Sequence, residues 1–199
     1  TVEPILRRLH LEHRDDYTDI AFARNVGLIS YADQRKLLHT RVAIAGLGGV
    51  GGSHLMALTR SGIGAFTLSD FDVFSPANVN RQYGSDLSGF GRPKLEVMVE
   101  RALGVNPFLD LRCFTEGVTD DNLDDFLGGV DIVVDGLDFF AQDVRRKLFN
   151  RALERGIPVV TAAPAGYSGS LLAFMPGGMN YDRYFGVSDD TSDMERLLR

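Results

Sequence analysis

Apolar and polar positions along this chain change period repeatedly, and after residue 40 the changes come at regular intervals. Short apolar runs bounded by glycine or polar residues are typical of buried strands, and longer runs with apolar residues every three or four positions are typical of helices. The pattern predicts strands at residues 42–45, 64–72, 108–114, 130–135, 158–162 and 168–175, and helices at residues 53–60, 93–105, 122–127 and 142–155.

Strands that alternate with helices form βαβ units, which build a parallel sheet covered by helices on both faces. We therefore expect one α/β domain at residues 41–186, a Rossmann-like, doubly wound and mostly parallel sheet. The last strand follows Gly166 and could run antiparallel at an edge of this sheet. Residues 1–40 form an N-terminal helical arm and residues 187–199 a C-terminal segment in this division of the chain.

The arm contains two helical patterns, at residues 3–12 and 31–39, around a loop-like stretch with one conspicuous cation, Arg24. Helices before the first strand are not part of the core of a nucleotide-binding fold, so we expect the arm to pack against the domain or against a partner. The C-terminal segment ends on a polar, helix-like run at residues 191–199, from which a further region could continue.

Composition is that of an ordinary soluble globular domain, with 44% hydrophobic and 24% charged residues among 199. The net charge of -6 argues against a protein that binds nucleic-acid phosphates, because such a protein carries a basic face. No segment approaches the ~18 consecutive apolar residues that a membrane helix needs. Cys113 is the only cysteine, which excludes an internal disulfide and a cysteine-only zinc site. We therefore expect a cytoplasmic protein without nucleic-acid or membrane partners.

A glycine-rich loop joins the first predicted strand to the first helix of the sheet, with Gly46, Gly48, Gly49 and Gly51 in close succession. Glycine lets the backbone turn sharply and lets a phosphate approach N–H groups at the positive end of a helix. The spacing also matches the dinucleotide fingerprint, and Asp70 lies about 20 residues further on, where an acid would bind ribose hydroxyls. The loop predicts a nucleotide site, and an NAD(P)- or FAD-binding oxidoreductase is one way to use it.

Cations and amides follow the second predicted strand. A dehydrogenase does not need cations there, because the cofactor carries the chemistry of hydride transfer. Transfer of a phosphoryl or nucleotidyl group does, because negative charge grows on the triphosphate. Arg81 and Lys94 follow successive strands on the side where open α/β sheets bind ligands, although solvated loop residues are the alternative interpretation. The polar groups of this region are Asp70, Asp72, Asn78, Arg81, Gln82 and Lys94.

Two further carboxylates follow the predicted strand at residues 130–135. Asp135 ends the strand, and Asp138 lies three residues on in the next loop. A carboxylate in this place could hold Mg²⁺, which takes one or two carboxylates together with phosphate oxygens and water. The other interpretation is a helix N-cap, formed by Asp138 or Asp143. The spacing alone leaves both open.

These motifs, in this order, resemble those of the ThiF/MoeB/HesA family, the ubiquitin-activating-enzyme-like adenylyltransferases, over roughly residues 20–186. The resemblance implies a Rossmann-like domain that binds ATP and Mg²⁺ and usually forms a homodimer. It also implies adenylation of a carboxylate, commonly the C-terminal glycine of a ubiquitin-like protein, with release of pyrophosphate. The matching runs are Gly46-Leu-Gly-Gly-Val-Gly51, Asp70-Phe-Asp72, Asn78-Val-Asn-Arg-Gln82, Gly91-Arg-Pro-Lys94 and Asp135-x-x-Asp138.

Carried over position by position, the resemblance implies a role for each matching residue. Gly49 would face the phosphates and Asp70 the ribose, while Asp138 would hold the magnesium ion. Arg24 corresponds to the family's N-terminal arginine, which reaches from one subunit into the site of the other. Such an arginine would help cations of the site offset the charge that grows on the triphosphate. The residues implied to hold the triphosphate are Asn78, Arg81, Gln82 and Lys94.

The chain departs from the family pattern in three places. Phe139 stands where the family has asparagine after the second aspartate. Residues 179–183, where a first zinc-binding cysteine pair would fall, contain no cysteine, so we expect no zinc. The acceptor cysteine that some relatives use is also absent from this chain, and mid-strand Cys113 is expected to be a packed thiol. A non-catalytic nucleotide-binding subunit therefore remains an alternative, beside the oxidoreductase, to an adenylyltransferase that acts on a ubiquitin-like protein or peptide.

Overall fold

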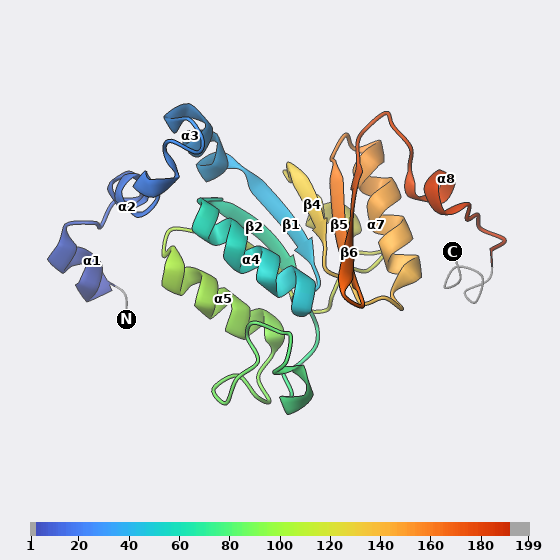
Figure 1. Cartoon of the computed structure of the whole chain (residues 1–199), viewed down its shortest axis with the longest axis horizontal. Helices are drawn as coiled ribbons and strands as arrows, with labels where there is room; N and C mark the ends of the chain where they lie inside the picture. The colour runs from blue at the N-terminus through green and yellow to red at the C-terminus, as the bar shows by residue number, and fades with distance from the viewer. Residues whose placement is uncertain (1–2, 192–199) are drawn as a thin grey trace.

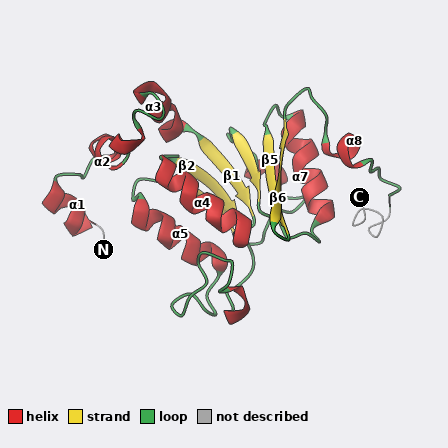
Figure 2. Cartoon of the chain, in the orientation of Figure 1, coloured by secondary structure: helices red, strands yellow, loops and turns green. Residues whose placement is uncertain are grey.

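The computed structural model describes residues 3–191, so nearly all of the helix-like run predicted at residues 191–199 lies outside the described residues. Strands and helices alternate from β1 onward (Figures 1 and 2). The helices are α1 (Glu3–Leu9), α2 (Arg14–Ala21), α3 (Tyr31–His39), α4 (Gly49–Ser61), α5 (Lys94–Val105), α6 (Leu123–Phe126), α7 (Gln142–Glu154) and α8 (Tyr181–Phe185), with short 3₁₀ helices η1 (Ala23–Asn25) and η2 (Pro76–Asn78). The strands are β1 (Arg41–Ala45), β2 (Ala65–Ser69), β3 (Asp110–Phe114), β4 (Ile132–Asp135), β5 (Val159–Ala165) and β6 (Ser168–Phe174).

The six strands form one sheet in the order β3-β2-β1-β4-β5-β6. All neighbours are parallel except β5 and β6, which form an antiparallel hairpin. The predicted fold class is therefore confirmed, together with the antiparallel strand at the edge. The strand order reverses direction between β1 and β4, and in open α/β sheets such a switch point opens a crevice at the carboxyl ends of the strands.

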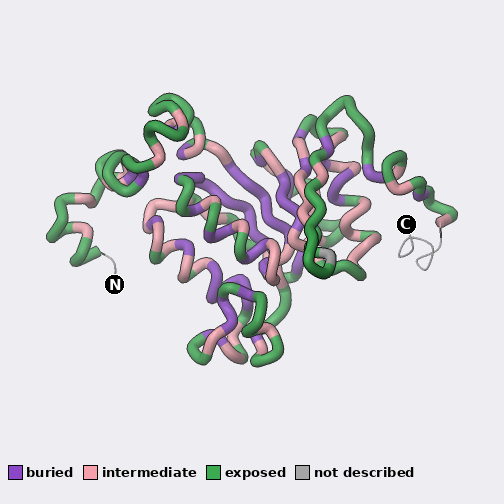
Figure 3. The backbone as a smooth tube through the Cα atoms, in the orientation of Figure 1, coloured by how far each residue is buried: buried purple, intermediate pink, exposed green. Residues whose placement is uncertain are grey.

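Alternate residues of β1 enter two separate cores, one on each face of the sheet. Val42 and Ile44 pack in the core that includes Leu55 of α4 and Met98 of α5. Ala43 and its neighbours on the other face pack in the core that includes Phe149 of α7. Figure 1 shows α4 and α5 together over β1 and β2, with α7 beside β5 and β6. Figure 3 shows the consequence for burial, because β1 and β2 are buried along their length whereas β6 is largely exposed.

The arm packs against the domain from α2 onward. Phe22 and Leu38 are buried, and the Tyr17 hydroxyl donates to the backbone carbonyl of Val105 at the end of α5. Helix α3 has the predicted bounds, whereas α2 was not predicted because its sequence is mostly polar and buries only Thr18. Helix α1 has no buried residue and extends from the body of the protein (Figure 1).

Cys113 corrects one expectation. It lies on β3, an edge strand whose residues are exposed or only partly buried, and its side chain is exposed. The expected packed thiol is wrong, because a mid-strand position buries a side chain only where a helix covers that part of the sheet. Partial burial still raises the pKa of the Cys113 thiol above its usual value.

Candidate functional site

The glycine loop brings the end of β1 to the start of α4 in one tight turn. Gly46 has a φ of +86°, in the left-handed region that favours glycine, and its N–H donates to the carbonyl of Ser69 at 2.8 Å. A Cβ on Gly51 would lie 1.8 Å from the Gly46 carbonyl oxygen, so any side chain there would force the helix away from the loop. Gly51 thus serves the close packing that places the amino terminus of α4 at the end of β1.

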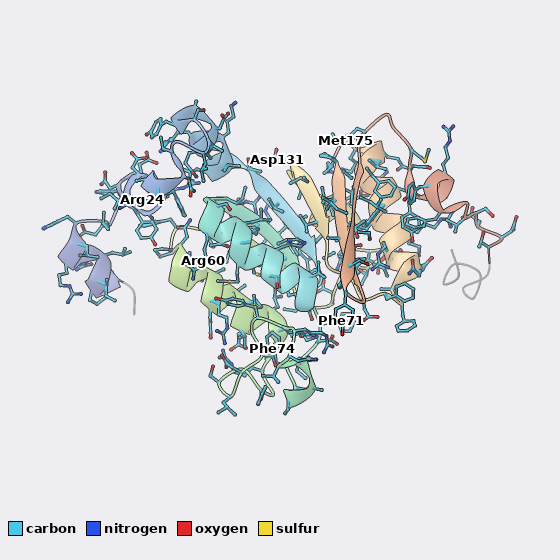
Figure 4. All side chains as sticks on the ribbon, viewed as in Figure 1. Arg24, Arg60, Phe71, Phe74, Asp131 and Met175 are labelled. Carbon is cyan, nitrogen blue, oxygen red and sulfur yellow. The ribbon has the colours of Figure 1, made fainter. Side chains whose placement is uncertain are left out.

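A cavity of about 620 Å³ opens at the carboxyl ends of β1, β2, β4 and β5, at the switch point of the sheet. Its volume is typical of small-molecule sites. Among the residues implied by the sequence, those that line it are Gly46, Gly48, Gly49, Asp70, Asp72, Arg81, Gln82, Lys94 and Asp138. Figure 4 shows Phe71, which also lines the cavity, at this end of the sheet.

Asp70 closes the cavity wall between β1 and β2. Its carboxylate accepts from the N–H of Leu47 at 2.7 Å and from the N–H of Asp72 at 2.8 Å. Burial raises the pKa of Asp70, and these two backbone hydrogen bonds act against that rise. Because each carboxylate oxygen can accept a second hydrogen bond, Asp70 can still receive the hydroxyl groups of a ribose.

The cations lie on the α5 side of the glycine loop. Lys94 begins α5, its side chain is 8% exposed, and its Nζ lies 2.9 Å from a carboxylate oxygen of Asp72. The Arg81 guanidinium is exposed and donates to the carbonyl of Ala77 and the side chain of Asn80, both at 3.1 Å. It forms no ion pair within residues 3–191, so its charge is available to an anion in the cavity.

Gln82 provides a further indication of a ligand site in this cavity. Its side chain is buried, and its Oε1 has no hydrogen-bond partner among the described residues. Buried polar atoms are almost always paired, so an unpaired one beside a cavity indicates a ligand or water in the functional state. A Cβ on Gly48 would lie only 3.7 Å from the Gln82 amide nitrogen, which places this side chain beside the glycine loop.

The opposite wall is organised by Arg145, which the sequence pattern did not single out. Its Nε donates to Asp135 Oδ2 at 2.8 Å, and its Nη2 donates to the carbonyls of both Leu137 at 2.8 Å and Asp138 at 3.0 Å. Asp135 also accepts from the Thr161 hydroxyl at 2.8 Å. The side chains of Arg145 and Asp135 are 12% and 3% exposed. This buried fork fixes the loop that carries Asp138.

Asp138 is the carboxylate of this loop that remains open to the cavity. One of its oxygens accepts from the N–H of Phe140 at 3.0 Å, and the side chain is otherwise exposed. Asp135 is committed to Arg145, Thr161 and the N–H of Leu137, so it has no room for a metal. The N-cap interpretation is excluded, because the N-cap residue of α7 is Ala141, without a side-chain cap.

The fit of Mg²⁺ to this donor set is straightforward. Residues 3–191 contain no group of three or more ligating side chains that could hold a metal unaided. A single carboxylate suits Mg²⁺ only when phosphate oxygens and water complete its shell. Asp138 therefore fits a magnesium ion that enters with a nucleotide.

Three implied residues stay outside the cavity. Gly51 packs behind the loop, as described above. The Asn78 side chain turns away, because its Oδ1 accepts from the N–H of Ser75 at 3.0 Å and closes the cap of η2. Its expected contact with a triphosphate has no support from this position. Arg24 lies on the arm, well away from Phe71 at the cavity (Figure 4), and forms no ion pair within residues 3–191.

Fold and cavity together define a nucleotide-binding α/β protein whose glycine loop, partly buried Asp70 and cations face one crevice. The comparisons with known proteins then identify the family: residues 22–197 match the ThiF family, and the chain belongs to it. No helix among residues 3–191 has the length and apolar character needed to span a membrane.

The relatives of this chain are named for different substrates. The sulfur carrier protein ThiS adenylyltransferase of Escherichia coli is 30% identical over 74% of this chain and 58% of its own length. The tRNA threonylcarbamoyladenosine dehydratase of Bacillus subtilis is 33% identical over 72% of this chain and 56% of its own. The chain therefore spans less than two thirds of these relatives.

Solved structures agree with the fold. The tRNA threonylcarbamoyladenosine dehydratase of E. coli in complex with ATP is 30% identical and superposes with a TM-score of 0.68 over 72% of this chain and 58% of that protein. The structure of PaaA covers 91% of this chain and 61% of its own at a TM-score of 0.72, and at 21% identity it supports the fold alone.

Proposed function

We propose that this chain is an ATP-dependent adenylyltransferase, which activates a carboxylate as an acyl-adenylate and releases pyrophosphate. The observation that carries the proposal is the meeting of the glycine loop, Arg81, Lys94 and the unpaired oxygen of Gln82 in one cavity. A hydride-transfer site would not need these cations, whereas a triphosphate that accumulates charge does. The solved relative in complex with ATP supports the same choice of nucleotide.

The chemistry needs no nucleophile from the protein. A carboxylate oxygen of the substrate attacks the α-phosphorus, and the bond from that phosphorus to the α,β-bridging oxygen breaks. The electron pair leaves with pyrophosphate, and no proton is transferred. Alignment of the two reactants is one contribution of the protein. The other is cationic charge: Lys94 and Arg81 offset the negative charge that grows on the leaving group.

Asp138 would hold Mg²⁺ together with oxygens of the triphosphate. The ion would supply further positive charge at the phosphates, where it neutralises the leaving group. Arg145 keeps the loop that carries Asp138 in one conformation, so this carboxylate is positioned before the nucleotide enters.

Arg24 is proposed to act in a second copy of the chain. Within its own chain it lies far from the cavity, on an arm whose first helix has no buried residue. A homodimer in which each arm reaches the other cavity would give the arginine a phosphate to bind, as arginine fingers do in trans. Mixing Arg24→Ala with Lys94→Met subunits should restore about a quarter of the sites, because about half of randomly mixed dimers are hybrids and one of the two sites in each hybrid is intact.

The substrate is proposed to be the carboxylate of a protein or peptide. Relatives are named for a sulfur carrier protein and for tRNA, so the family alone leaves the choice open. The net charge of -6 disfavours an RNA, which needs a basic face. We expect the reaction to take place in the cytoplasm.

Exchange of labelled pyrophosphate into ATP tests the proposal, because it reports adenylation without any acceptor. Exchange that depends on an added carboxylate and on Mg²⁺ would support it. ATP binding without exchange, over a panel of carboxylates and with candidate partner chains supplied, would instead identify a non-catalytic nucleotide-binding subunit. Tight NADH binding that Arg81→Ala leaves unchanged would point to an oxidoreductase.

A further inference from the structure

The two walls of the cavity differ in chemistry. The wall from β1, β2 and the start of α5 is polar and cationic, as described above. The wall from the loop after β4, from α7, from β6 and from α8 is apolar. Its lining side chains are Leu137, Val144, Phe149, Leu172, Tyr181 and Phe185, which we call the apolar wall.

Aromatic rings form the deepest part of the apolar wall. Phe149 is fully buried and Tyr181 is 5% exposed, with ring centroids 5.3 Å apart in an edge-to-face arrangement. Phe185 packs on Tyr181 at 4.6 Å. The Tyr181 hydroxyl donates to Gln142 Oε1 at 2.7 Å, so its polar end is engaged by the protein. What the ring offers to the cavity is an apolar surface.

Charged groups on this side of the cavity are already satisfied. Arg145 and Asp135 are bound to each other and to neighbouring backbone and hydroxyl groups. No uncommitted cation lines the apolar wall among the described residues, so phosphate groups belong on the opposite wall. A polar group placed against the apolar wall would lose its water without gaining a partner, which is unfavourable.

Phe139 stands at the border of the two walls. Its ring is 60% exposed and lines the cavity, whereas that of Phe140 is 76% exposed and does not. Its backbone carbonyl accepts from the side chain of Gln142, the residue that also binds the Tyr181 hydroxyl, and its ring packs edge-to-face on that of Phe140 with centroids 5.5 Å apart. An exposed ring held in place beside a cavity gains free energy when an apolar ligand covers it.

From this geometry we infer that the apolar wall is the subsite for the acyl substrate, and that the activated carboxylate carries a bulky aliphatic or aromatic group within a few bonds of its reacting oxygen. The inference rests on the proposed function. A carboxylate at the border, beside Asp138 and the glycine loop, places such a group against Leu172, Tyr181 and Phe185. A glycine-ended chain would leave Leu172 and Phe185, which are only partly buried, without this contact.

The experiment uses the full chain and pyrophosphate exchange with acetylated dipeptides of matched length that end in Gly, Ala, Leu or Phe. We expect kcat/KM to rise by about 10-fold or more from the Gly to the Leu or Phe member, since a hydrophobic pocket discriminates by at least that factor. Phe139→Ala should reduce this preference several-fold. Tyr167→Ala removes an exposed ring that lies outside the cavity and should keep it.

Each remaining outcome decides something. Exchange that is equal or faster with the Gly-ended dipeptide, or that Phe139→Ala and Tyr167→Ala alter alike, overturns the apolar subsite and leaves the adenylyltransferase standing. A lack of exchange with every carboxylate, when calorimetry shows that ATP binds, overturns the proposed function and the subsite with it. A second variant, Leu172→Ser, changes the β6 part of the wall and should also reduce the preference several-fold while its circular dichroism spectrum stays that of the wild type; an unchanged preference overturns the subsite.

Discussion

The two walls of the cavity lie at the carboxyl edge of the same sheet, yet they are built in different ways. The polar wall is made of two segments, the glycine loop after β1 and the long loop between β2 and α5, and each of them leaves the carboxyl end of a strand. The apolar wall joins the loop after β4 to α7, β6 and α8, and its network ties Asp135 to Thr161 and Gln142 to Tyr181. A nucleotide motif in the sequence therefore indicates only the polar wall of the cavity. The apolar wall depends on how distant segments pack together.

Lys94 tests the polar wall with the largest expected effect. Lys94→Met removes a buried cation from the leaving-group side, so we expect kcat/KM for pyrophosphate exchange to fall about 100-fold or more. Arg92→Met is the matched control, because the Arg92 guanidinium is paired with Glu96 and Glu100 outside the cavity. A loss that is equal in both variants would remove Lys94 from the proposed mechanism.

Arg145 tests the apolar wall. Arg145→Ala leaves Asp135 buried without its cation, so we expect the free energy of unfolding in urea to fall by about 3–5 kcal/mol. Arg151 lies on the same helix as Arg145 and forms an exposed ion pair with Asp124 of α6, so Arg151→Ala should lower the free energy of unfolding by about 1 kcal/mol or less.

Arg145→Lys keeps the charge but not the planar fork that reaches several acceptors. We expect this variant to fold and to need about 10-fold more Mg²⁺ for half-maximal exchange, because the loop with Asp138 is less well positioned. An unchanged Mg²⁺ requirement would limit Arg145 to stability.

Asp70 gives the comparison a pH dependence. Because burial raises its pKa, the carboxylate takes up a proton at a higher pH than an ordinary aspartate. ATP affinity should therefore decrease as the pH falls through this raised pKa. The sign for stability is opposite: the contribution of Asp70 to the free energy of unfolding is greatest at low pH and declines as pH rises through the raised pKa.

Asp70→Asn should abolish both pH steps and weaken ATP binding about 10-fold, from the loss of charged hydrogen bonds to the ribose. Titration calorimetry at several pH values measures this. A wild-type ATP affinity that stays constant through the acidic range would contradict the assignment.

The smallest expected effect concerns the loop at residues 74–91, which carries Arg81. The Asp86 carboxylate accepts from the Ser88 hydroxyl and N–H and from the Arg101 guanidinium, and these bonds lower its pKa to about 2. Its stabilising contribution is therefore complete above about pH 4 and is lost as the pH falls toward 2. As the pH falls over that range, the protection of the Ser88 and Gly89 N–H groups, measured as their hydrogen exchange relative to the intrinsic rate at the same pH, should decrease in the wild type. In Asp86→Asn this protection should be low throughout.

Much of the fold could be predicted from the sequence, because its signals are local. The alternation of periods indicated β1, β4 and α7 with nearly their observed bounds, and the predicted bounds of α3 were the observed ones. The glycine spacing and the acid at the end of β2 indicated a nucleotide crevice for the same reason. The glycine loop and the helix that follows it are set by neighbouring residues, and their conformation does not depend on which strands pair with β1.

What only the tertiary structure decided are contacts between segments far apart in the chain. Nothing in the local pattern shows that Arg145 meets Asp135 or that Cys113 lies on an uncovered edge. The apolar wall depends on β6 pairing with β5 beside β4, a choice of neighbours that no single segment encodes. Sequence alone indicated a nucleotide site in a Rossmann-like crevice, and packing decided which side chains form the wall opposite to it.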